Sequence, residues 1–229
     1  MLRSAVLALA VTWLVASEAS ERTPAPSKLR VTHRAAVEGG IDAAPLVGLG
    51  YDARIPQVIA GRDVTITVGW KLPLPGLSLD DFRLDAGARL PIVSRGALRW
   101  TVDARVGLVR MRREAVHAHG VQLGLGTGIG GYWRVPGVRF DAAWDPNVGT
   151  HVEAQSGLRR FDPEVRSGWY SSLGMAFKVG GAVVLRLGPV DVEARGGLGA
   201  TARTSLISAR GWLVSYVPFY AGLEVGYRF

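Results

Sequence analysis

The chain has 229 residues, of which 48% are hydrophobic and 20% are charged, and its formal net charge is +8. This length allows one domain behind a short leader. Cysteine is absent, which excludes disulfides, zinc–thiolate sites and thiol nucleophiles. Most arginines stand singly at alternate positions and no basic helix is visible, so we do not expect nucleic acid as a partner.

The amino-terminal residues have the features of a secretory signal peptide. Arg3 supplies a positive start, residues 5–16 form an apolar run, and Ser17 and Ala19 are the small residues expected before a cleavage site. Twelve residues are too few for a membrane-spanning helix, which needs roughly 20. We therefore predict a signal peptide over residues 1–19, with an uncleaved anchor as the alternative, and a periplasmic lead-in over residues 20–28.

From residue 29 onward, apolar and polar residues alternate with a period of two, which indicates β-strands rather than helices. In the eighth segment the apolar residues stay on odd numbers through Gly180 and Gly181, so we place the next turn at Gly188–Pro189. The ten predicted segments cover about residues 29–38, 46–55, 62–72, 82–92, 98–108, 121–133, 138–155, 169–187, 190–198 and 213–229.

The connections between these segments alternate in length. Short turns are predicted around residues 94–96, 135–137 and 188–189, whereas longer loops are predicted over residues 73–81, 111–120, 158–167 and 201–212. Transmembrane barrels have this asymmetry, with short periplasmic turns and longer external loops. Residues 56–61 are a longer stretch at a junction where a short turn is expected. They hide either a bulge or a misplaced strand, so eight or twelve strands are alternatives to ten.

The last segment carries the sharpest motif. One face has Phe219, Ala221, Leu223, Val225, Tyr227 and Phe229, and the other has Tyr220, Gly222, Glu224, Gly226 and Arg228. This ending resembles the carboxy-terminal strand of small bacterial outer-membrane β-barrel proteins. The resemblance implies an all-β, antiparallel, up-and-down transmembrane barrel over residues 29–229, located in the outer membrane of a Gram-negative cell. It also implies that Tyr227 and Phe229 form the signal read by the barrel-insertion machinery.

A barrel of this kind must close, because hydrocarbon offers no partner to the backbone groups of an open edge. The charged positions must then face the interior, since an Arg near the lipid midplane costs about 2–4 kcal/mol. We expect a plugged, salt-bridged lumen with gaps near the glycines. The predicted lumen charge network comprises Arg83, Asp85, Arg89, Arg99, Asp103, Arg105, Arg139, Asp141, Arg186, Asp191, Glu193, Arg195, Glu224 and Arg228. Aromatic girdles are predicted from Tyr51, Trp70, Trp100, Trp133, Trp144, Trp169, Phe219, Tyr227 and Phe229.

Two histidine-containing segments are candidates for chemistry. His117 and His119, with Glu114, fall in a predicted external loop, where two histidines one residue apart suit a metal but no third ligand is fixed. We predict a solvated loop there and no metal site. His151 and Glu153 are predicted on the inward face, as a barrel hydrolase would need. No Ser or Asp stands at a spacing from them that is typical of a catalytic group, so we predict no catalytic residue.

The glycine-rich segment over residues 124–131 superficially suggests a phosphate loop. It lacks the Lys-Ser/Thr ending and lies inside a strand. We expect its inward glycines to make room in the lumen instead.

Arginines cluster in two of the predicted external loops. Contact with lipopolysaccharide phosphates or with an acidic envelope partner is one interpretation, and an ordinary solvated rim is the other. The predicted basic patch comprises Arg110, Arg112, Arg113, Arg159 and Arg160.

The function expected from these features is not enzymatic and uses no cofactor. We predict a structural or docking barrel, such as one component of an envelope-spanning assembly. Its expected partners are outer-membrane lipid, lipopolysaccharide, the barrel-insertion machinery and an envelope protein. A narrow pore for small solutes is the alternative, and a membrane-embedded hydrolase is the second alternative.

Overall fold

The computed structural model describes residues 30–42, 44–74, 80–113, 116–133, 135–156, 166–171, 175–202 and 219–229. The predicted signal peptide and lead-in lie outside these residues. Within them, no helix has the length and apolarity needed to cross a bilayer. The strands are β1 (Thr32–Asp42), β2 (Ala44–Ile59), β3 (Arg62–Pro73), β4 (Phe82–Arg95), β5 (Leu98–Arg113), β6 (Val116–Tyr132), β7 (Pro136–Ala154), β8 (Gly168–Ser171), β9 (Met175–Leu187), β10 (Val190–Ala202) and β11 (Phe219–Arg228).

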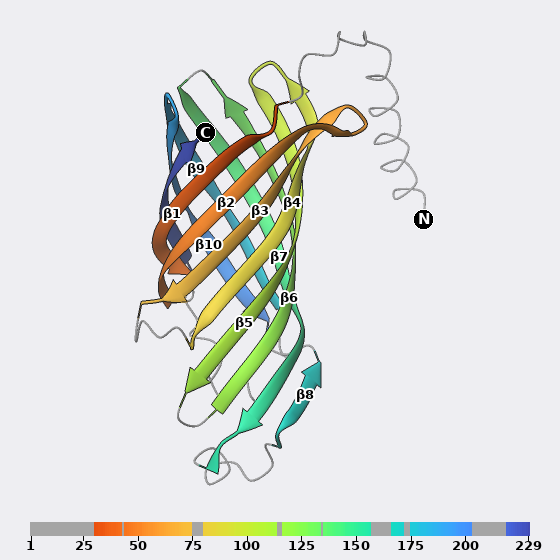
Figure 1. Cartoon of the computed structure of the whole chain (residues 1–229), viewed down its shortest axis with the longest axis vertical. Helices are drawn as coiled ribbons and strands as arrows, with labels where there is room; N and C mark the ends of the chain where they lie inside the picture. Colours follow the sequence, from red (N-terminus) through yellow and green to blue (C-terminus); the bar gives the residue numbers. More distant parts are fainter. Residues whose placement is uncertain are drawn as a thin grey trace.

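Ten of these strands form a closed antiparallel barrel. Each pairs with its neighbour along the chain from β1 to β7, then β7 pairs with β9, β9 with β10 and β10 with β11. The ring closes where β11 pairs with β1, from Arg34 opposite Arg228 to Asp42 opposite Tyr220. Figure 1 shows the tilted ring from the side. The prediction of an up-and-down barrel of about ten strands is therefore confirmed.

The two ends of the barrel differ. At the turn end, where β1 begins and β11 ends, the connections run from Ile59 to Arg62, Arg95 to Leu98, Tyr132 to Pro136 and Leu187 to Val190. Gly61, Gly96 and Gly188 have φ values of 70°, 58° and 66° there, which a glycine adopts without strain. The predicted turn at Gly188–Pro189 is confirmed. Residues 56–61 contain an irregularity in the β2–β3 register between Ile55 and Ile59, so the bulge is the correct alternative.

At the opposite end, β5, β6, β7 and β8 project beyond the other strands, as Figure 1 shows at the bottom. We call this part the extension: residues 110–113, 116–121, 149–154 and β8. The predicted loop over residues 111–120 is wrong, because Arg113 pairs with Val116 and both strands continue to the tip. Polar residues on the outward face there conceal the period of two. The predicted loops over residues 73–81, 158–167 and 201–212 lie largely outside the described residues.

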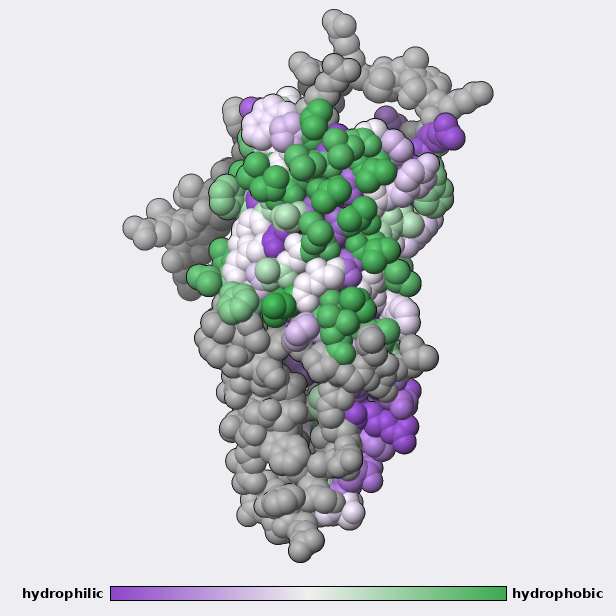
Figure 2. Space-filling model, turned by 90° about the vertical axis from the view of Figure 1, so that its left-hand side faces the viewer, coloured by the Kyte–Doolittle hydropathy of each residue, from purple (hydrophilic) through white to green (hydrophobic). Residues whose placement is uncertain are grey.

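The outward face of the barrel is apolar. Phe140 and Leu198 are 68% and 70% exposed, and the other outward aliphatic residues of these strands are also exposed to a large degree. Figure 2 shows hydrophobic residues gathered over the upper part of one side and hydrophilic residues near the end of the extension. The inward positions carry glycines and charged residues. The predicted alternation, with apolar residues outside and polar residues inside, therefore holds along the barrel.

Aromatic residues stand near both edges of the apolar surface. At the turn end, the His33 ring stacks against the rings of Tyr51 and Phe229, at centroid distances of 6.0 and 5.7 Å. Toward the extension, the Trp144 ring stacks on the Phe177 ring at a centroid distance of 6.3 Å.

The length of β11 agrees with the height of the apolar band of a transmembrane barrel. The ten residue steps from Phe219 to Phe229 span about 33 Å along the strand, or about 25 Å after a tilt of about 40°, which equals the usual height of that band.

Strand β7 contains an irregularity that the sequence did not reveal. Val121 pairs with Gly149 and Gln122 with Asn147, so Val148 is an extra residue on β7. Because one inserted residue reverses the facing of everything that follows, Val152 and Ala154 point inward and are buried. The alternation predicted over residues 138–155 would put these two residues on the outward face, so that prediction is wrong beyond Val148.

Candidate functional site

The lumen is the candidate site, and glycines on β6 make the space for its charged side chains. A Cβ atom built on Gly126 would lie 2.5 Å from Asp103 Oδ1, and one on Gly124 would lie 2.8 Å from Asp145 Oδ1. A Cβ on Gly128 would overlap the Asp141 carboxylate. The glycine-rich segment over residues 124–131 therefore accommodates neighbouring lumen side chains, as expected.

Glu38 on β1 is the centre of the first group of ion pairs. Its Oε1 lies 2.7 Å from Lys71 Nζ of β3, and its Oε2 accepts a hydrogen bond from Arg195 of β10. Glu38 is only 8% exposed. A buried carboxylate is stable in its charged form only when it is paired, and here two cations from two strands pair with it.

A second group joins the other side of the lumen. Arg139 of β7 donates from Nε to Asp141 Oδ1 at 2.7 Å and from Nη2 to Glu193 Oε1 at 3.0 Å. Arg105 of β5 donates to Asp145 Oδ1, also at 3.0 Å. Lys178 of β9 lies 2.6 Å from Asp42 Oδ2 and 3.9 Å from Asp145 Oδ2.

These residues form what we call the ion-pair layer: Asp42, Glu38, Lys71, Arg105, Arg139, Asp141, Asp145, Lys178, Glu193 and Arg195. The layer separates two cavities, because Glu38, Lys71, Arg105, Arg139 and Arg195 line both of them. The cavity on the side of the extension has a volume of about 150 Å³. The other, which we call the vestibule, has a volume of about 910 Å³ and reaches the turn glycines Gly61 and Gly96.

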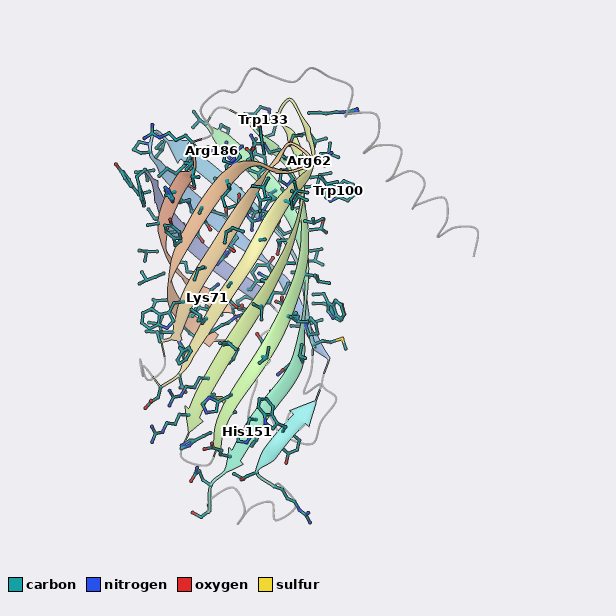
Figure 3. All side chains as sticks on the ribbon, turned by 45° about the vertical axis from the view of Figure 1, so that its right-hand side comes forward. Arg62, Lys71, Trp100, Trp133, His151 and Arg186 are labelled. Atoms are coloured by element: carbon teal, nitrogen blue, oxygen red, sulfur yellow. The ribbon has the colours of Figure 1, made fainter. Side chains whose placement is uncertain are left out.

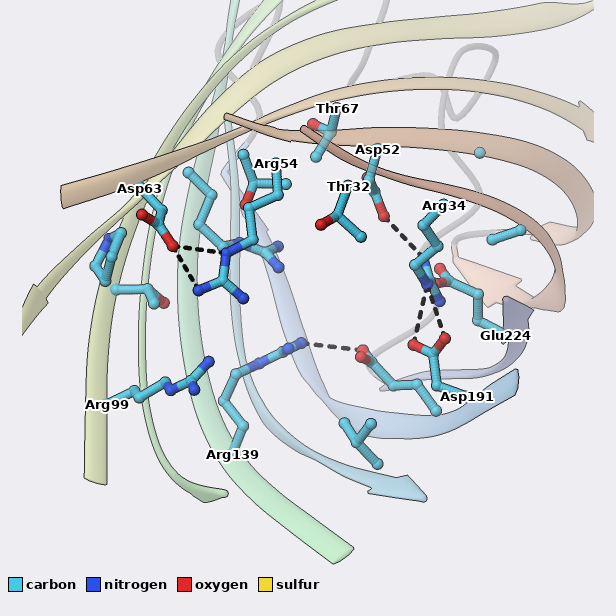
Figure 4. A pocket seen from close by; sticks show the side chains of 18 of the residues that line it. Thr32, Arg34, Asp52, Arg54, Asp63, Thr67, Arg99, Arg139, Asp191 and Glu224 are labelled. Carbon is cyan, nitrogen blue, oxygen red and sulfur yellow. Dashed lines mark hydrogen bonds and ion pairs between the residues drawn. The ribbon is translucent and has the colours of Figure 1, made fainter. Parts of the chain in front are cut away.

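Arg34 organises one wall of the vestibule, as Figure 4 shows. Its Nη1 lies 2.8 Å from Asp52 Oδ2, its Nε lies 3.0 Å from Asp191 Oδ2, and its Nη2 binds Glu224. On the neighbouring strands, Arg54 Nη2 of β2 lies 2.5 Å from Asp63 Oδ2 of β3. These pairs hold β1, β2, β3, β10 and β11 together from inside the ring.

The predicted charge network is thus brought together only in part. Among the residues that the structure describes, ten of its fourteen members take part in ion pairs: Arg83, Asp85, Arg105, Arg139, Asp141, Asp191, Glu193, Arg195, Glu224 and Arg228. Arg89, Asp103, Arg99 and Arg186 face the lumen with no ion pair to another described residue, and the last two lie against the Tyr132 ring at 5.4 and 5.1 Å. The predicted network did not include Glu38, Asp42, Lys71, Asp145 and Lys178, although their positions in the alternation place them inside.

The predicted basic patch and the histidines meet on the outward face of the extension. Arg110 of β5 lies opposite His119 of β6 in the strand register, His119 lies opposite His151 of β7, and His151 lies opposite Trp169 of β8. These four residues therefore form one row across four strands. Figure 3 shows His151 at this end, far from Arg186 at the turn end. The expectation that His151 faces the lumen is wrong, because the extra residue Val148 turns it outward.

The neighbouring row on the same face contains Arg112, His117 and Glu153. Glu153 was also expected inside the barrel and is half exposed here, with its carboxylate oxygens 3.7 Å from His117 Nδ1 and 4.0 Å from His151 Nδ1. His117 and His119 lie on β6 rather than in a loop. No three His, Asp or Glu residues of the described ranges are grouped so that they could hold a metal ion.

The arginines of the patch have acidic neighbours on the β3–β4 connection. Arg110 and Arg112 lie 3.6 and 3.3 Å from the Asp80 carboxylate. Arg159, Arg160 and the side chain of Arg113 lie outside the described residues.

No protein-family model matches the chain, and no curated protein matches it. Among solved structures, the N-terminal β-barrel domain of Pseudomonas aeruginosa OprF is similar at 11% identity, covering 86% of this chain and 97% of that one with a TM-score of 0.30. CdiB from Acinetobacter baumannii is similar at 9% identity, covering 87% of this chain and 60% of that one with a TM-score of 0.28. The assignment of the fold rests on the strand pairing described above.

Proposed function

We propose that the chain is an integral β-barrel of the outer membrane with a structural or docking role and a sealed lumen. The apolar exterior of a closed ring supports the membrane location, because such a surface is stable only against lipid. The short turns and the longer far end support an orientation with the turn end in the periplasm and the extension outside the cell.

The ion-pair layer is the observation that carries the sealed lumen. An ion crossing the barrel would have to separate pairs such as Glu38–Lys71 and Arg105–Asp145, in which the acidic side chains are 9% and 6% exposed. Removing one partner of a buried pair costs about 3–5 kcal/mol, and several such pairs stand side by side. The narrow pore is the second candidate, since the vestibule offers an entrance on one side.

A docking role follows from what the extension presents. Arg110 and Arg112 stand on its outward face with three histidines, next to the apolar surface of the barrel. Lipopolysaccharide phosphates or an acidic envelope protein suit this charge, as each Lys or Arg near an anionic surface contributes about 1 kcal/mol. Neither a cofactor nor catalysis belongs to this proposal, and His151 and Glu153 serve the surface of the extension.

Conductance tests the sealed lumen. The refolded barrel is inserted into a planar bilayer after its folding has been verified by its altered gel mobility without boiling. We expect no conductance steps from the wild type. Regular steps that grow larger in Glu38→Ala would establish the pore in place of the sealed barrel.

A pull-down from envelope extracts tests docking. Arg110→Ser with Arg112→Ser is compared with Arg30→Ser with Arg54→Ser, which removes the same charge at the opposite end. We expect the partner to be lost only with the first pair of substitutions. Equal recovery with both pairs would remove the extension from the docking role.

A further inference from the structure

The vestibule carries more positive than negative charge. Eleven Arg or Lys side chains line it against seven Asp or Glu side chains. The acidic residues are engaged in the pairs described above, whereas Arg99 and Arg186 form no ion pair with another described residue. Charges enclosed by a protein wall interact more strongly than charges in water, and such an excess attracts an anion into the cavity.

The excess is concentrated at the turn end, around Tyr132. Arg99 of β5 and Arg186 of β9 approach the Tyr132 ring from two strands, with their guanidinium carbons 5.4 and 5.1 Å from its centroid. Asp191 of β10 lies opposite Arg186 of β9 in the strand register, and its Oδ1 lies 3.6 Å from Arg228 Nε, so Arg228 of β11 lies at the same end of the lumen. Three guanidinium groups therefore share one corner of the vestibule.

Arg228 gives a second, independent sign of a ligand site. Its Nη2 is buried and has no hydrogen-bond partner among the described residues. Its nearest carboxylate, Asp191, lies 3.6 Å from Nε and is already held at 3.0 Å by Arg34. A buried donor without a partner destabilises the folded protein, and an oxyanion that accepts a hydrogen bond from Nη2 removes this cost.

We propose that the vestibule binds a small phosphate-bearing anion at Arg99, Arg186 and Arg228. Guanidinium groups match the paired oxygens of a phosphate, and Tyr132 holds two of them in place. A cavity of about 910 Å³ has the size of a small-molecule site. A lipid headgroup is a poor occupant, because its chains would lie in a charged lumen. The inference rests on the proposed function only for the direction of entry, from the periplasmic side.

Titration calorimetry of the refolded, detergent-solubilised barrel tests the site, with inorganic phosphate as the probe at constant ionic strength in chloride. We expect saturable binding to one site per chain. Arg99→Gln with Arg186→Gln weakens binding at least tenfold, because two charge-assisted contacts are lost. The matched control, Arg30→Gln with Arg166→Gln, removes the same charge at two exposed side chains that do not line the vestibule, and it leaves the affinity within twofold of wild type.

Three results would overturn the proposal: no saturable binding by the folded wild type, equal binding by the Arg99/Arg186 variant, or binding of a polyglutamate peptide without binding of phosphate. Since the double substitution removes like-charge repulsion, it is expected to fold. If it does not, Arg186→Lys is titrated instead, and an unchanged affinity counts against the site. A barrel that conducts ions yet binds phosphate at these residues would remove the sealed lumen and keep the site.

Discussion

Replacing Glu38 by Gln isolates the energetic role of the ion-pair layer. The substitution keeps the volume of the side chain and removes only its charge. Lys71 and Arg195 then face the lumen without the carboxylate that they share. The two ion pairs that join β1 to β3 and to β10 are lost.

The expected cost follows from burial. Removing one partner of a buried pair costs about 3–5 kcal/mol, mainly because the other charge remains buried and unpaired. The Lys71 and Arg195 side chains are 23% and 32% exposed, so water stabilises part of each freed cation. We therefore expect the free energy of unfolding to fall by about 3 kcal/mol, the lower limit of that range.

Urea unfolding of the barrel in lipid vesicles, followed by its tryptophan fluorescence, measures this change. Glu153→Gln is the matched control, because it is the same substitution at a side chain that is 50% exposed. Exposed pairs contribute about 0–1 kcal/mol, and we expect the control to stay within that limit. A Glu38→Gln variant that is no less stable than the control would refute the assignment of a stabilising role to the layer.

Three further predictions concern packing, lipid contact and assembly. Gly180→Ala should lower the free energy of unfolding by about 1–3 kcal/mol, because the added Cβ would overlap the Gly196 carbonyl and the Tyr220 hydroxyl. At the control position Gly69, a Cβ would have its nearest atom at 3.9 Å, so Gly69→Ala should change this free energy by less than about 1 kcal/mol. Equal effects of the two substitutions would contradict this packing. Leu223→Arg, at the middle of β11, should cost about 2–4 kcal/mol in vesicles, and unchanged urea unfolding would show that lipid does not reach this position. Phe229→Ala should lower the free energy of unfolding in vitro by about 1 kcal/mol, because the ring contact with His33 is lost. In cells, the amount of assembled barrel should fall several-fold. A normal yield in the outer-membrane fraction would exclude an insertion signal at Phe229.

The sequence predicted the ring and the facing of its strands because a period of two is a local property. Each barrel strand has an apolar face outside and a polar face toward the lumen, so its residue types alternate over many positions. Glycine and proline at residues 188–189 likewise mark a turn by local backbone preference. These features needed no knowledge of distant contacts.

The bulge at Val148 could not be predicted in this way. Val148, Val152 and Ala154 are all apolar and all even-numbered, and they read as one continuous lipid face. Only the pairing of Gly149 with Val121 reveals the extra residue. A single insertion then places His151 and Glu153 on the opposite side from the one expected.

Which charges pair was also beyond the sequence. The alternation gives the face of a residue but not its distance from residues on other strands. Arg99 and Arg105 both point inward from β5, yet Arg105 lies 3.0 Å from Asp145 of β7, whereas Arg99 has no ion pair within the described part of the chain. That difference depends on the stagger of the strands around the ring, which is a property of the closed barrel.

The facing of alternate residues toward lipid is the central claim, and spin-label accessibility along β11 tests it most directly. The chain has no cysteine, so a single introduced cysteine is labelled uniquely. In vesicles, labels at Ala221, Leu223 and Val225 should collide strongly with oxygen, which dissolves in lipid, and labels at Tyr220 and Gly222 should not. Equal oxygen accessibility at both sets, or equal access of a water-soluble relaxing agent to both, would contradict a strand that faces lipid on one side and an enclosed lumen on the other.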